Sequence, residues 1–318
     1  MNQEVVLGID LGGTNTKAGL VDRNGKVLAF ERFNTHAKEE FPIFLEHLSI
    51  VFNRISGPFK DQISIKGVGI GAPNVNFYTG NMERAHNFSW GEITPLAPAI
   101  HEKLNLPVVA TNDANVAALG EMVFGIAREM KNFAVLTLGT GLGSGIVVDR
   151  KLLLGQDGLA GEMGHVNVRP DGRNCNCGLS GCLETYVSVT GIKRTVFKLM
   201  ADRKVDSILR GYNYHELDGE MIAQAALDGD PIAKEAFTYT GNILGTKLAD
   251  LVAYFNPEAV ILTGGLTHAR DLLLVPTQES MDARLFPAFR GKVRLLLSSV
   301  GGAHDAVLGA AALAWQHL

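Results

Sequence analysis

The sequence has little cysteine, a modest share of charge and no long uninterrupted apolar segment. Only three of its 318 residues are cysteines, and this small, odd number argues against a disulfide framework. The longest segment without charge, residues 132–148, carries four glycines and is too short and polar for a membrane helix. No secretory signal precedes the first apolar strand. We therefore expect a soluble, cytoplasmic protein with no membrane partner.

Positive charge is also scarce. The formal net charge is −4, so no overall positive field favours nucleic acid or anionic lipid. Charged residues make up 19% and apolar residues 46% of the chain, a balance that supports a large core and excludes disorder as the main state. The length suits two domains. Glycine is abundant, with 36 residues that gather in clusters, which predicts special backbone turns.

Two segments of the chain share one layout. Residues 7–22 (LGIDLGGTNTKAGLVD) align without gaps on residues 134–149 (AVLTLGTGLGSGIVVD). Each reads as an apolar strand, a glycine turn and a second apolar strand that ends in aspartate. This pattern indicates an internal duplication and predicts two α/β domains with a cleft between them.

Apolar periodicity and turn residues predict the coarse order of helices and strands. The boundary near Asn115, inferred from the duplication, divides the chain into residues 1–115 and 116–303. The C-terminal helix, about residues 304–318, completes the first domain, and Asp305 is expected to cap it. The predicted strands are residues 5–10, 18–21, 65–71, 108–110 and 259–263, and the predicted helices are residues 40–55, 113–124, 219–227, 231–255 and 305–315.

The first glycine turn lies in residues 10–17 (DLGGTNTK). Gly12 and Gly13 let a ligand approach the backbone, and Thr14 with the free amides can donate to phosphate oxygens. Asp10, at a strand end, could hold magnesium through water. The alternative is an ordinary tight hairpin turn. The sequence contains neither a GxxxxGK[ST] phosphate loop nor a GxGxxG dinucleotide motif.

Two further glycine clusters follow predicted strands. Residues 139–145 (GTGLGSG) could grip the same polyphosphate as the first turn, although a hairpin turn again accounts for them alone. Gly264 and Gly265 could lie against a flat ring such as adenine, but by themselves they indicate only a loop.

Asn112 and Asp113 stand where a strand ends and a helix begins. Either one can cap that helix. The functional alternative makes Asp113 a base that accepts a hydroxyl proton during phosphoryl transfer, because a helix N-terminus favours an ionised carboxylate.

The most specific pattern is residues 164–184 (GHVNVRPDGRNCNCGLSGCLE), which contain every cysteine of the chain. Cys175, Cys177 and Cys182 fall within eight positions, and His165 can supply a fourth ligand. Three thiolates and one imidazole make a closed tetrahedral zinc site of the structural kind. The alternative is a loop with three unliganded thiols.

Polar side chains flank this cysteine-rich segment. If one ring nitrogen of His165 binds zinc, the other can donate a hydrogen bond in a fixed direction. Together with the carboxylates of Glu162 and Glu184, it could bind sugar hydroxyls. Otherwise the two glutamates are solvated surface charges.

Six motifs, DLGGTNTK, NDANVAALGE, LGTGLGSGI, GEMGHVNV, CNCGLSGCLE and ILTGG, occur in this order across nearly the whole chain. Their combination resembles the ROK family of bacterial sugar kinases and repressors, and most closely its zinc-containing, glucokinase-like members. The resemblance implies an actin-like, hexokinase-like fold of two ribonuclease-H-like domains. It also implies ATP, Mg²⁺ and structural Zn²⁺ as cofactors, and a homodimer.

The same resemblance assigns roles to individual residues. Asp113 matches the catalytic base, and Asn112, Glu162, His165 and Glu184 match sugar contacts. Gly71 and Asn87 lie where the family's sugar loop runs, although the segment after Asn74 departs from the usual pattern. The contacts to ATP are Asp10, Gly12, Gly13, Thr14, Lys17, Thr140, Gly141, Gly264 and Gly265, and the zinc ligands are His165, Cys175, Cys177 and Cys182.

The resemblance predicts direct in-line transfer of the γ-phosphate of Mg-ATP to glucose, with domain closure that excludes water. The alternatives are an N-acylhexosamine kinase acting on N-acetylglucosamine or N-acetylmannosamine, a fructokinase, and a sugar sensor or repressor. Polyphosphate or another nucleotide could replace ATP as the phosphate donor. Repressors of the family carry an N-terminal helix-turn-helix domain, whereas here the first phosphate strand starts by residue 5, so we expect no nucleic-acid partner.

Overall fold

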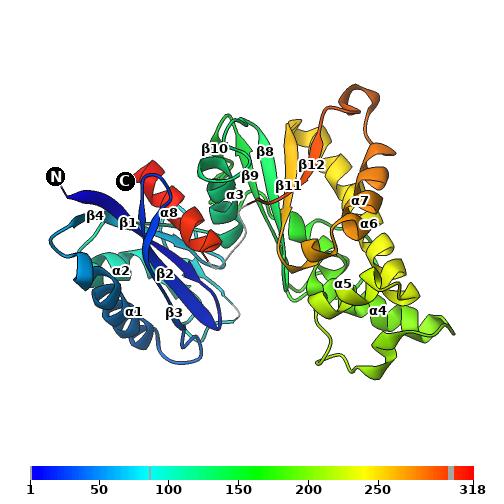
Figure 1. Cartoon of the computed structure of the whole chain (residues 1–318), viewed down its shortest axis with the longest axis horizontal. Coiled ribbons are helices and arrows are strands. Elements are labelled where there is room, and N and C mark those ends of the chain that lie inside the picture. The colour runs from blue at the N-terminus through cyan, green and yellow to red at the C-terminus, as the bar shows by residue number, and fades with distance from the viewer. Residues whose placement is uncertain (1, 86, 300–303) are drawn as a thin grey trace. The chain divides into compact units, whose positions relative to one another are not determined.

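The computed structural model describes residues 2–85, 87–299 and 304–318, which form two compact units (Figure 1). The first unit comprises Met1–Lys131, Gly145–Gly161 and Ser298–Leu318, and the second comprises Asn132–Ser144 and Glu162–Leu297. The first unit thus extends beyond the boundary expected near residue 115.

The first unit is built on a five-stranded sheet in the order β3-β2-β1-β4-β7. Its strands are β1 (Gln3–Leu11), β2 (Asn15–Asp22), β3 (Val27–Asn34), β4 (Ile63–Gly71) and β7 (Val108–Thr111). Strands β1, β2 and β3 pair antiparallel, whereas β1, β4 and β7 are parallel. A separate hairpin pairs β5 (Met82–Glu83) with β6 (Ile93–Thr94).

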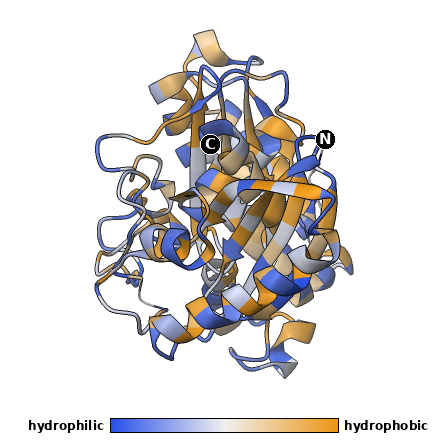
Figure 2. Cartoon of the chain, turned by 90° about the vertical axis from the view of Figure 1, so that its left-hand side faces the viewer, coloured by the Kyte–Doolittle hydropathy of each residue, from blue (hydrophilic) through white to orange (hydrophobic). Residues whose placement is uncertain are grey.

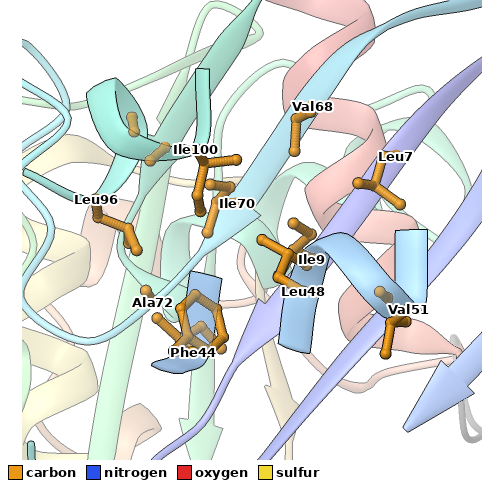
Figure 3. Close-up of a cluster of buried hydrophobic side chains, with 14 of the residues drawn as sticks. Leu7, Ile9, Phe44, Leu48, Val51, Val68, Ile70, Ala72, Leu96 and Ile100 are labelled. Carbon is orange, nitrogen blue, oxygen red and sulfur yellow. The ribbon is translucent and has the colours of Figure 1, made fainter. Parts of the chain in front are cut away.

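Helices lie on both faces of this sheet because its central strands are apolar on both sides. Helix α1 (Phe41–Ser56) buries Phe44, Leu48 and Val51 at helical spacing, and α2 (Leu96–Leu104) packs into the same core. Figure 3 shows these side chains meeting the apolar residues of β1 and β4. In Figure 2 the strands near the N-terminus are largely orange, whereas the helices in front of them alternate between orange and blue.

The C-terminal helix α8 (Asp305–His317) covers the other face of the sheet, beside α3 (Asp113–Val123). Its backbone approaches the sheet very closely. A Cβ atom added to Gly69 would lie 1.9 Å from the carbonyl oxygen of Ala310, so only glycine fits there. The expected cap is wrong in detail. The N-cap of α8 is His304, which makes no side-chain cap hydrogen bond, and Asp305 is the first helical residue.

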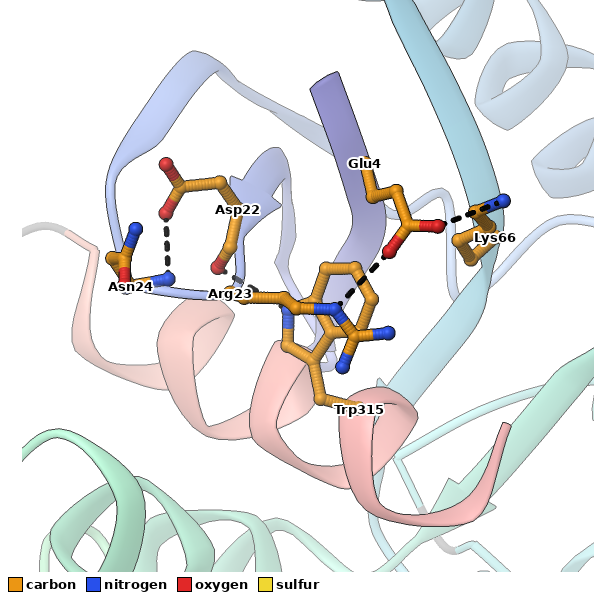
Figure 4. Close-up of polar contacts among 6 residues, drawn as sticks. All are labelled: Glu4, Asp22, Arg23, Asn24, Lys66 and Trp315. Carbon is orange, nitrogen blue, oxygen red and sulfur yellow. Dashed lines mark hydrogen bonds and ion pairs between the residues drawn. The ribbon is translucent and has the colours of Figure 1, made fainter. Parts of the chain in front are cut away.

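Trp315 anchors the end of α8 to the first hairpin (Figure 4). Its indole Nε1 donates to the carbonyl oxygen of Asp22 at 3.2 Å, and the Arg23 guanidinium lies 4.2 Å from its ring centroid. Arg23 in turn pairs with Glu4 on β1. The chain's last helix is therefore an integral part of the N-terminal unit.

A second five-stranded sheet repeats the pattern of the first, in the order β10-β9-β8-β11-β12. Its strands are β8 (Phe133–Leu138), β9 (Leu142–Val148), β10 (Lys151–Leu152), β11 (Ala259–Thr263) and β12 (Arg294–Leu297). The first three pair antiparallel and the last two add in parallel, as in the first sheet. This shared topology supports the duplication inferred from residues 7–22 and 134–149.

The second unit contains helices α4 (Val189–Asp202), α5 (Gly219–Leu227), α6 (Pro231–Phe255) and α7 (Asp271–Asp282). Helices α5 and α6 and strand β11 have the predicted bounds. Strands β3 and β12 and helices α2, α4 and α7 were not predicted. Among the described residues, no helix is both long and apolar enough to cross a membrane.

Candidate active site and metal centre

Three parallel strands of the first unit end side by side. Asp10 on β1 pairs in register with Gly71 on β4, and Gly71 pairs with Thr111 on β7. In open α/β sheets, ligands bind outside the carboxyl ends of the strands. The sheet thereby gathers the first glycine turn and the Asn112-Asp113 pair at one edge, although about 100 residues separate them in sequence.

The first glycine turn is held from behind by a buried threonine. The Thr35 hydroxyl donates to the Gly12 carbonyl oxygen at 2.6 Å, and the Thr35 amide donates to the Thr14 carbonyl at 3.0 Å. The hydroxyls of Thr16 and Thr35 lie 2.9 Å apart, and both residues are fully buried. Thr35 was missed in the sequence because its partners lie on another strand.

Asp10 and Lys17 form an ion pair across the β1–β2 hairpin, with Lys17 Nζ 3.1 Å from Asp10 Oδ2. Both side chains are only partly exposed, at 33% for Lys17 and 23% for Asp10. The structure thus places the Lys17 ammonium group beside Asp10, the residue expected to hold magnesium, next to the first glycine turn.

Asn112 is the cap of α3. Its side-chain oxygen accepts hydrogen bonds from the amides of Ala114 at 2.7 Å and Asn115 at 3.2 Å. Asp113 is the first helical residue, and its Oδ1 accepts from the Ala114 amide at 2.8 Å. Because Asn112 performs the capping, the cap alternative does not explain why an aspartate stands at position 113.

Asp113 remains partly open to solvent while protein crowds its carboxyl group. Loss of hydration raises the pKa of Asp113, and the negative charge of Asp10 raises it further, against the hydrogen bond from Ala114. A raised carboxyl pKa moves the group toward the range in which a general base works well near neutral pH.

The two residues expected on the sugar loop lie in different settings. A Cβ atom on Gly13 would come 3.3 Å from the Asn87 Cβ, so Asn87 stands directly beside the first glycine turn. Gly71 is buried in the sheet, and a Cβ there would lie 2.9 Å from Val116 on α3. Gly71 therefore lets α3 sit close to β4, and its contact with substrate stays a prediction.

The second glycine turn, between β8 and β9, is braced within the second unit. The Gly139 amide donates to the Gly141 carbonyl at 3.0 Å and closes the turn. Glu184 Oε2 accepts from the Leu142 amide at 2.9 Å, and the Thr190 hydroxyl donates to the Thr140 carbonyl at 2.9 Å.

Gly264 and Gly265 follow β11, next to the end of β8. Gly264 has a φ of 98°, and a Cβ there would lie 2.7 Å from the carbonyl carbon of Leu138. Both the backbone conformation and the close approach require glycine at this position. The third glycine cluster thus adjoins the strand that leads into the second glycine turn.

The cysteine-rich segment forms a compact ligand set. The candidate atoms of His165, Cys175, Cys177 and Cys182 all lie within 4.8 Å of one another. His165 Nδ1 is 3.8 Å from Cys175 Sγ, and Cys177 Sγ is 3.7 Å from Cys182 Sγ. A tetrahedral zinc ion would set these edges at about 3.6 Å for sulfur to nitrogen and about 3.8 Å for sulfur to sulfur. These two distances are compatible with a zinc site.

The thiols of this cluster compete for protons. Burial, together with the Cys177 and Cys175 thiols, raises the pKa of Cys182 to about 12, whereas hydrogen bonds lower the pKa of Cys177. Crowded thiolates need a cation to ionise together, and a bound metal deprotonates coordinating thiols. Because His165 turns Nδ1 toward Cys175, the opposite ring nitrogen remains for a second partner.

The two glutamates flank this cluster in the fold as in the sequence. Glu162 immediately precedes the short helix Met163–His165, and its carbonyl oxygen accepts from the His165 amide at 3.1 Å. Gly164 in that helix packs so closely on the Leu142 carbonyl that a Cβ would lie 2.3 Å from its oxygen. The histidine and Glu184 thus both adjoin the start of β9.

Sequence reasoning missed Arg173, which supports the cysteine-rich segment. Its guanidinium donates to the carbonyls of Thr185 and Gly191 and to the Thr195 hydroxyl, and it lies 4.5 Å from the Tyr186 ring centroid. Burial lowers its pKa. An arginine with carbonyl partners has no sequence signature of its own.

Comparisons with known proteins agree with this geometry. A sequence model of the ROK family matches residues 6–317. The glucokinase of Halalkalibacterium halodurans is 33% identical over 305 residues, or 95% of this chain and 92% of that protein. The structure of a ROK family glucokinase from Streptomyces griseus in complex with glucose and AMPPNP has a TM-score of 0.82 and 33% identity, covering 98% of this chain and 99% of that one. A xylose repressor of Caldicellulosiruptor bescii is 32% identical over 292 residues, or 91% of this chain and 73% of the repressor.

Proposed function

Because this chain belongs to the ROK family, we propose that it is an ATP-dependent hexose kinase with glucose as its preferred sugar. It transfers the γ-phosphate of ATP to a sugar hydroxyl and yields glucose 6-phosphate. The likeness to glucokinases extends over nearly the full length of both proteins. The observation that carries the proposal is the setting of Asp113, an aspartate at a strand-to-helix junction whose capping duty is performed by Asn112.

Asp113 acts as the general base. The sugar hydroxyl oxygen attacks the γ-phosphorus of ATP, and the bond from that phosphorus to the β–γ bridging oxygen breaks. The hydroxyl proton passes to the Asp113 carboxylate, and ADP leaves with the electron pair of the broken bond. Little covalent chemistry remains for the protein, so positioning and electrostatics supply most of the rate enhancement.

The glycine turns serve the phosphate donor. Gly12 closes the first turn, because its amide donates to the Asn15 carbonyl at 3.1 Å, and Gly13 and Thr14 offer their backbone amides beside Asp10. Lys17 adds a positive charge there. In the second unit, Thr140 and Gly141 form the equivalent turn, and Gly264 with Gly265 lies at the adenosine end. Mg²⁺ would be held through Asp10, and when bound it would neutralise part of the phosphate charge.

The sugar is read by Asn112 and Asn87 in the first unit and by Glu162, His165 and Glu184 in the second. His165, Cys175, Cys177 and Cys182 would hold zinc, and when bound it would cross-link this segment structurally, because four protein ligands complete a tetrahedral site. The protein itself contributes the imidazole ring of His165 in a fixed orientation. Its second ring nitrogen, Nε2, donates to a sugar hydroxyl.

A coupled ADP-release assay with Mg-ATP tests the function. It compares kcat/KM for glucose, N-acetylglucosamine, N-acetylmannosamine and fructose, with Asp113→Asn as the control. The kcat/KM for glucose should exceed that for each other sugar by more than tenfold, which corresponds to about 1.4 kcal/mol of transition-state binding. Preference for an acetylated sugar would assign an N-acylhexosamine kinase instead.

The likeness to a xylose repressor over 91% of this chain makes a sugar-responsive regulator the second candidate. Titration with glucose and xylose separates the two. A kinase turns ATP over with glucose and loses that turnover in Asp113→Asn, whereas a regulator binds its sugar equally well in both proteins and shows no turnover in either.

We further propose that the protein works in the cytoplasm as a homodimer. Three free cysteines gathered as metal ligands suit a reducing compartment, in which thiols persist. Sedimentation equilibrium of the metal-loaded protein tests the oligomeric state, and a mass of one chain at micromolar concentration would refute the dimer.

A further inference from the structure

The second glycine turn is held by the segment that immediately follows the last cysteine of the metal cluster. Three contacts join them: the Glu184 carboxylate accepts from the Leu142 amide at 2.9 Å, and the Val189 amide donates to the Gly139 carbonyl at 2.8 Å. The third is the bond from the Thr190 hydroxyl to the Thr140 carbonyl, at 2.9 Å. The turn of residues 139–142, closed by its own hydrogen bond from Gly139 to Gly141, is thus also held by a segment outside its two strands.

The fit of the Glu184 carboxylate against this turn is close. A Cβ atom on Gly141 would lie 2.3 Å from Glu184 Oε2 and 3.2 Å from its carboxyl carbon. The carboxylate therefore rests on the bare backbone of Gly141 while it binds the next amide along. Glycine is needed at position 141 because it leaves room for the Glu184 carboxylate. The motif around Gly141 does not reveal this need, since Glu184 lies 43 residues further along the chain.

The same carboxylate faces the metal cluster with its other oxygen. Glu184 Oε1 lies 3.7 Å from Cys175 Sγ. The backbone around Glu184 is also fixed, since its carbonyl accepts from the Ser188 hydroxyl at 2.7 Å and the Thr185 hydroxyl donates to the Cys182 carbonyl at 2.7 Å. The half-buried side chain of Glu184 therefore contacts both the second glycine turn and the cysteine-rich segment.

We propose that Glu184 and Thr190 are positioning residues for the phosphate donor, which hold the residue 139–142 turn in its nucleotide-binding shape and tie that shape to the metal cluster. This inference rests on the proposed kinase function and goes beyond the sugar contact that the family resemblance implies for Glu184. Glu184 then serves both substrates, because its carboxylate binds the sugar and also orders the turn that holds the phosphates.

The physical reason is preorganisation. A turn whose backbone is already ordered binds an anion at a smaller entropic cost than a turn that must be ordered on binding. Removal of the Glu184 carboxylate leaves the Leu142 amide without its charged acceptor and leaves space over Gly141, so the turn samples other conformations. Affinity for the nucleotide falls even though Glu184 itself need not touch it.

The test is direct titration of the zinc-loaded protein with a non-hydrolysable Mg-ATP analogue in the absence of sugar, and separately with glucose alone. Glu184→Ala should raise the Kd for the analogue about tenfold and also weaken glucose binding. Glu184→Gln, whose amide oxygen can still accept from Leu142, should restore most of the analogue affinity. Glu162→Ala, a change to a predicted sugar contact, should weaken glucose binding and leave the analogue affinity unchanged.

Thr190 provides an independent measurement, since it is not a predicted sugar contact. Thr190→Val should raise the Kd for the analogue about threefold and leave the Kd for glucose unchanged, and Thr190→Ser should bind both as the unaltered protein does. Thr238→Val is the matched control, because that hydroxyl donates to the Lys234 carbonyl within α6. Zinc content and Tm are recorded for each variant, so that loss of metal or of folding is recognised.

The outcomes separate the inference from the function. Unchanged analogue affinity in Glu184→Ala and Thr190→Val, with normal turnover of the unaltered protein, overturns the positioning role and leaves the kinase intact. An unaltered protein that binds no nucleotide overturns both. Loss of analogue affinity in Thr238→Val to the same degree as in Thr190→Val also refutes the inference, because the effect would then be a general loss of stability.

Discussion

Asn112 caps helix α3 with its side-chain oxygen and thereby leaves its neighbour Asp113 available for chemistry. Two adjacent polar residues at a helix start usually share the task of satisfying the first amides. Here one residue does most of it, with bonds to the Ala114 and Asn115 amides. Only one oxygen of the Asp113 carboxylate, Oδ1, accepts a hydrogen bond from the first turn of the helix. The carboxylate lies at the sheet edge near which Asp10 stands, close to the end of β1.

Replacement of Asp113 by asparagine should reduce kcat by about 10²–10⁴-fold, the usual contribution of a positioned general base. Shape and capping are preserved, because Asn112 is untouched. Steady-state kinetics with Mg-ATP and glucose measure the loss, and calorimetric titration with glucose should show affinity close to that of the unaltered protein. Asn112→Ala is the companion variant, and it should cost about 1 kcal/mol of stability through the cap.

The raised pKa of Asp113 predicts a pH dependence with a defined sign. Activity needs the ionised carboxylate, so kcat/KM should fall as the pH drops through a value above the usual aspartate range of about 3.9. Stability follows the opposite course: a raised carboxyl pKa favours the folded state at low pH, and that benefit is lost as the pH rises through the folded pKa. Asp113→Asn should therefore have a higher Tm than the unaltered protein at pH 8, with no such gain at pH 3. An equal Tm at pH 8 would contradict the raised pKa of the Asp113 carboxyl group.

The metal cluster predicts one zinc ion per chain that depends on all four ligands. Cys177→Ser should lose the zinc, which atomic absorption measures, and the KM for glucose should rise because the His165 ring loses its fixed orientation. His165→Ala should do the same. His215→Ala is the control, since the His215 backbone amide donates to the Asn213 side chain and its ring meets Tyr214 edge-on, away from the cysteine cluster. Full zinc content in the Cys177 variant would exclude the proposed ligand set.

The Asp10–Lys17 ion pair predicts that a change at Lys17 affects the KM for Mg-ATP more than the KM for glucose. Lys17→Met leaves Asp10 without its cation, and the KM for Mg-ATP should rise about tenfold, or 1.4 kcal/mol, with little change for glucose. Lys66→Met is the matched control, because Lys66 also pairs with an acidic partner at 3.1 Å, Glu4, but at the opposite end of the sheet strands. Equal effects of the two substitutions on the KM for Mg-ATP would argue against a role for Lys17 at the phosphates.

The contacts of Trp315 predict that helix α8 stabilises the first hairpin, β1–β2. Trp315→Ala removes a half-buried ring, its hydrogen bond to Asp22 and the stacking of Arg23 (Figure 4). We expect a loss of roughly 2–3 kcal/mol in the free energy of unfolding, below the full cost of a buried Trp→Ala change. Urea denaturation measures it. Tyr254→Ala is the control, since that ring is 86% exposed and its removal should change stability by less than about 0.5 kcal/mol.

Much of the fold could be predicted from local patterns. Helices α5 and α6 and strand β11 have the predicted bounds, because Asp218 and Asp230 cap the helices and apolar periodicity defines their length. The duplication of the glycine hairpin likewise predicts the equal strand orders of the two sheets. Strand β3 was missed because none of its side chains is fully buried, so it lacks the apolar run that identifies β1.

The sequence alone predicted the chemistry: the kinds of ligand for a metal, the glycine turns suited to phosphates and an aspartate as the general base. Its motifs also determined the family. Only the tertiary structure decided which residue caps α3, that Thr35 supports the first turn, and that Glu184 joins the metal cluster to the second turn. The reason is that a residue's type and its neighbours along the chain are local properties, whereas a hydrogen bond between distant segments exists only after strands, helices and turns have packed.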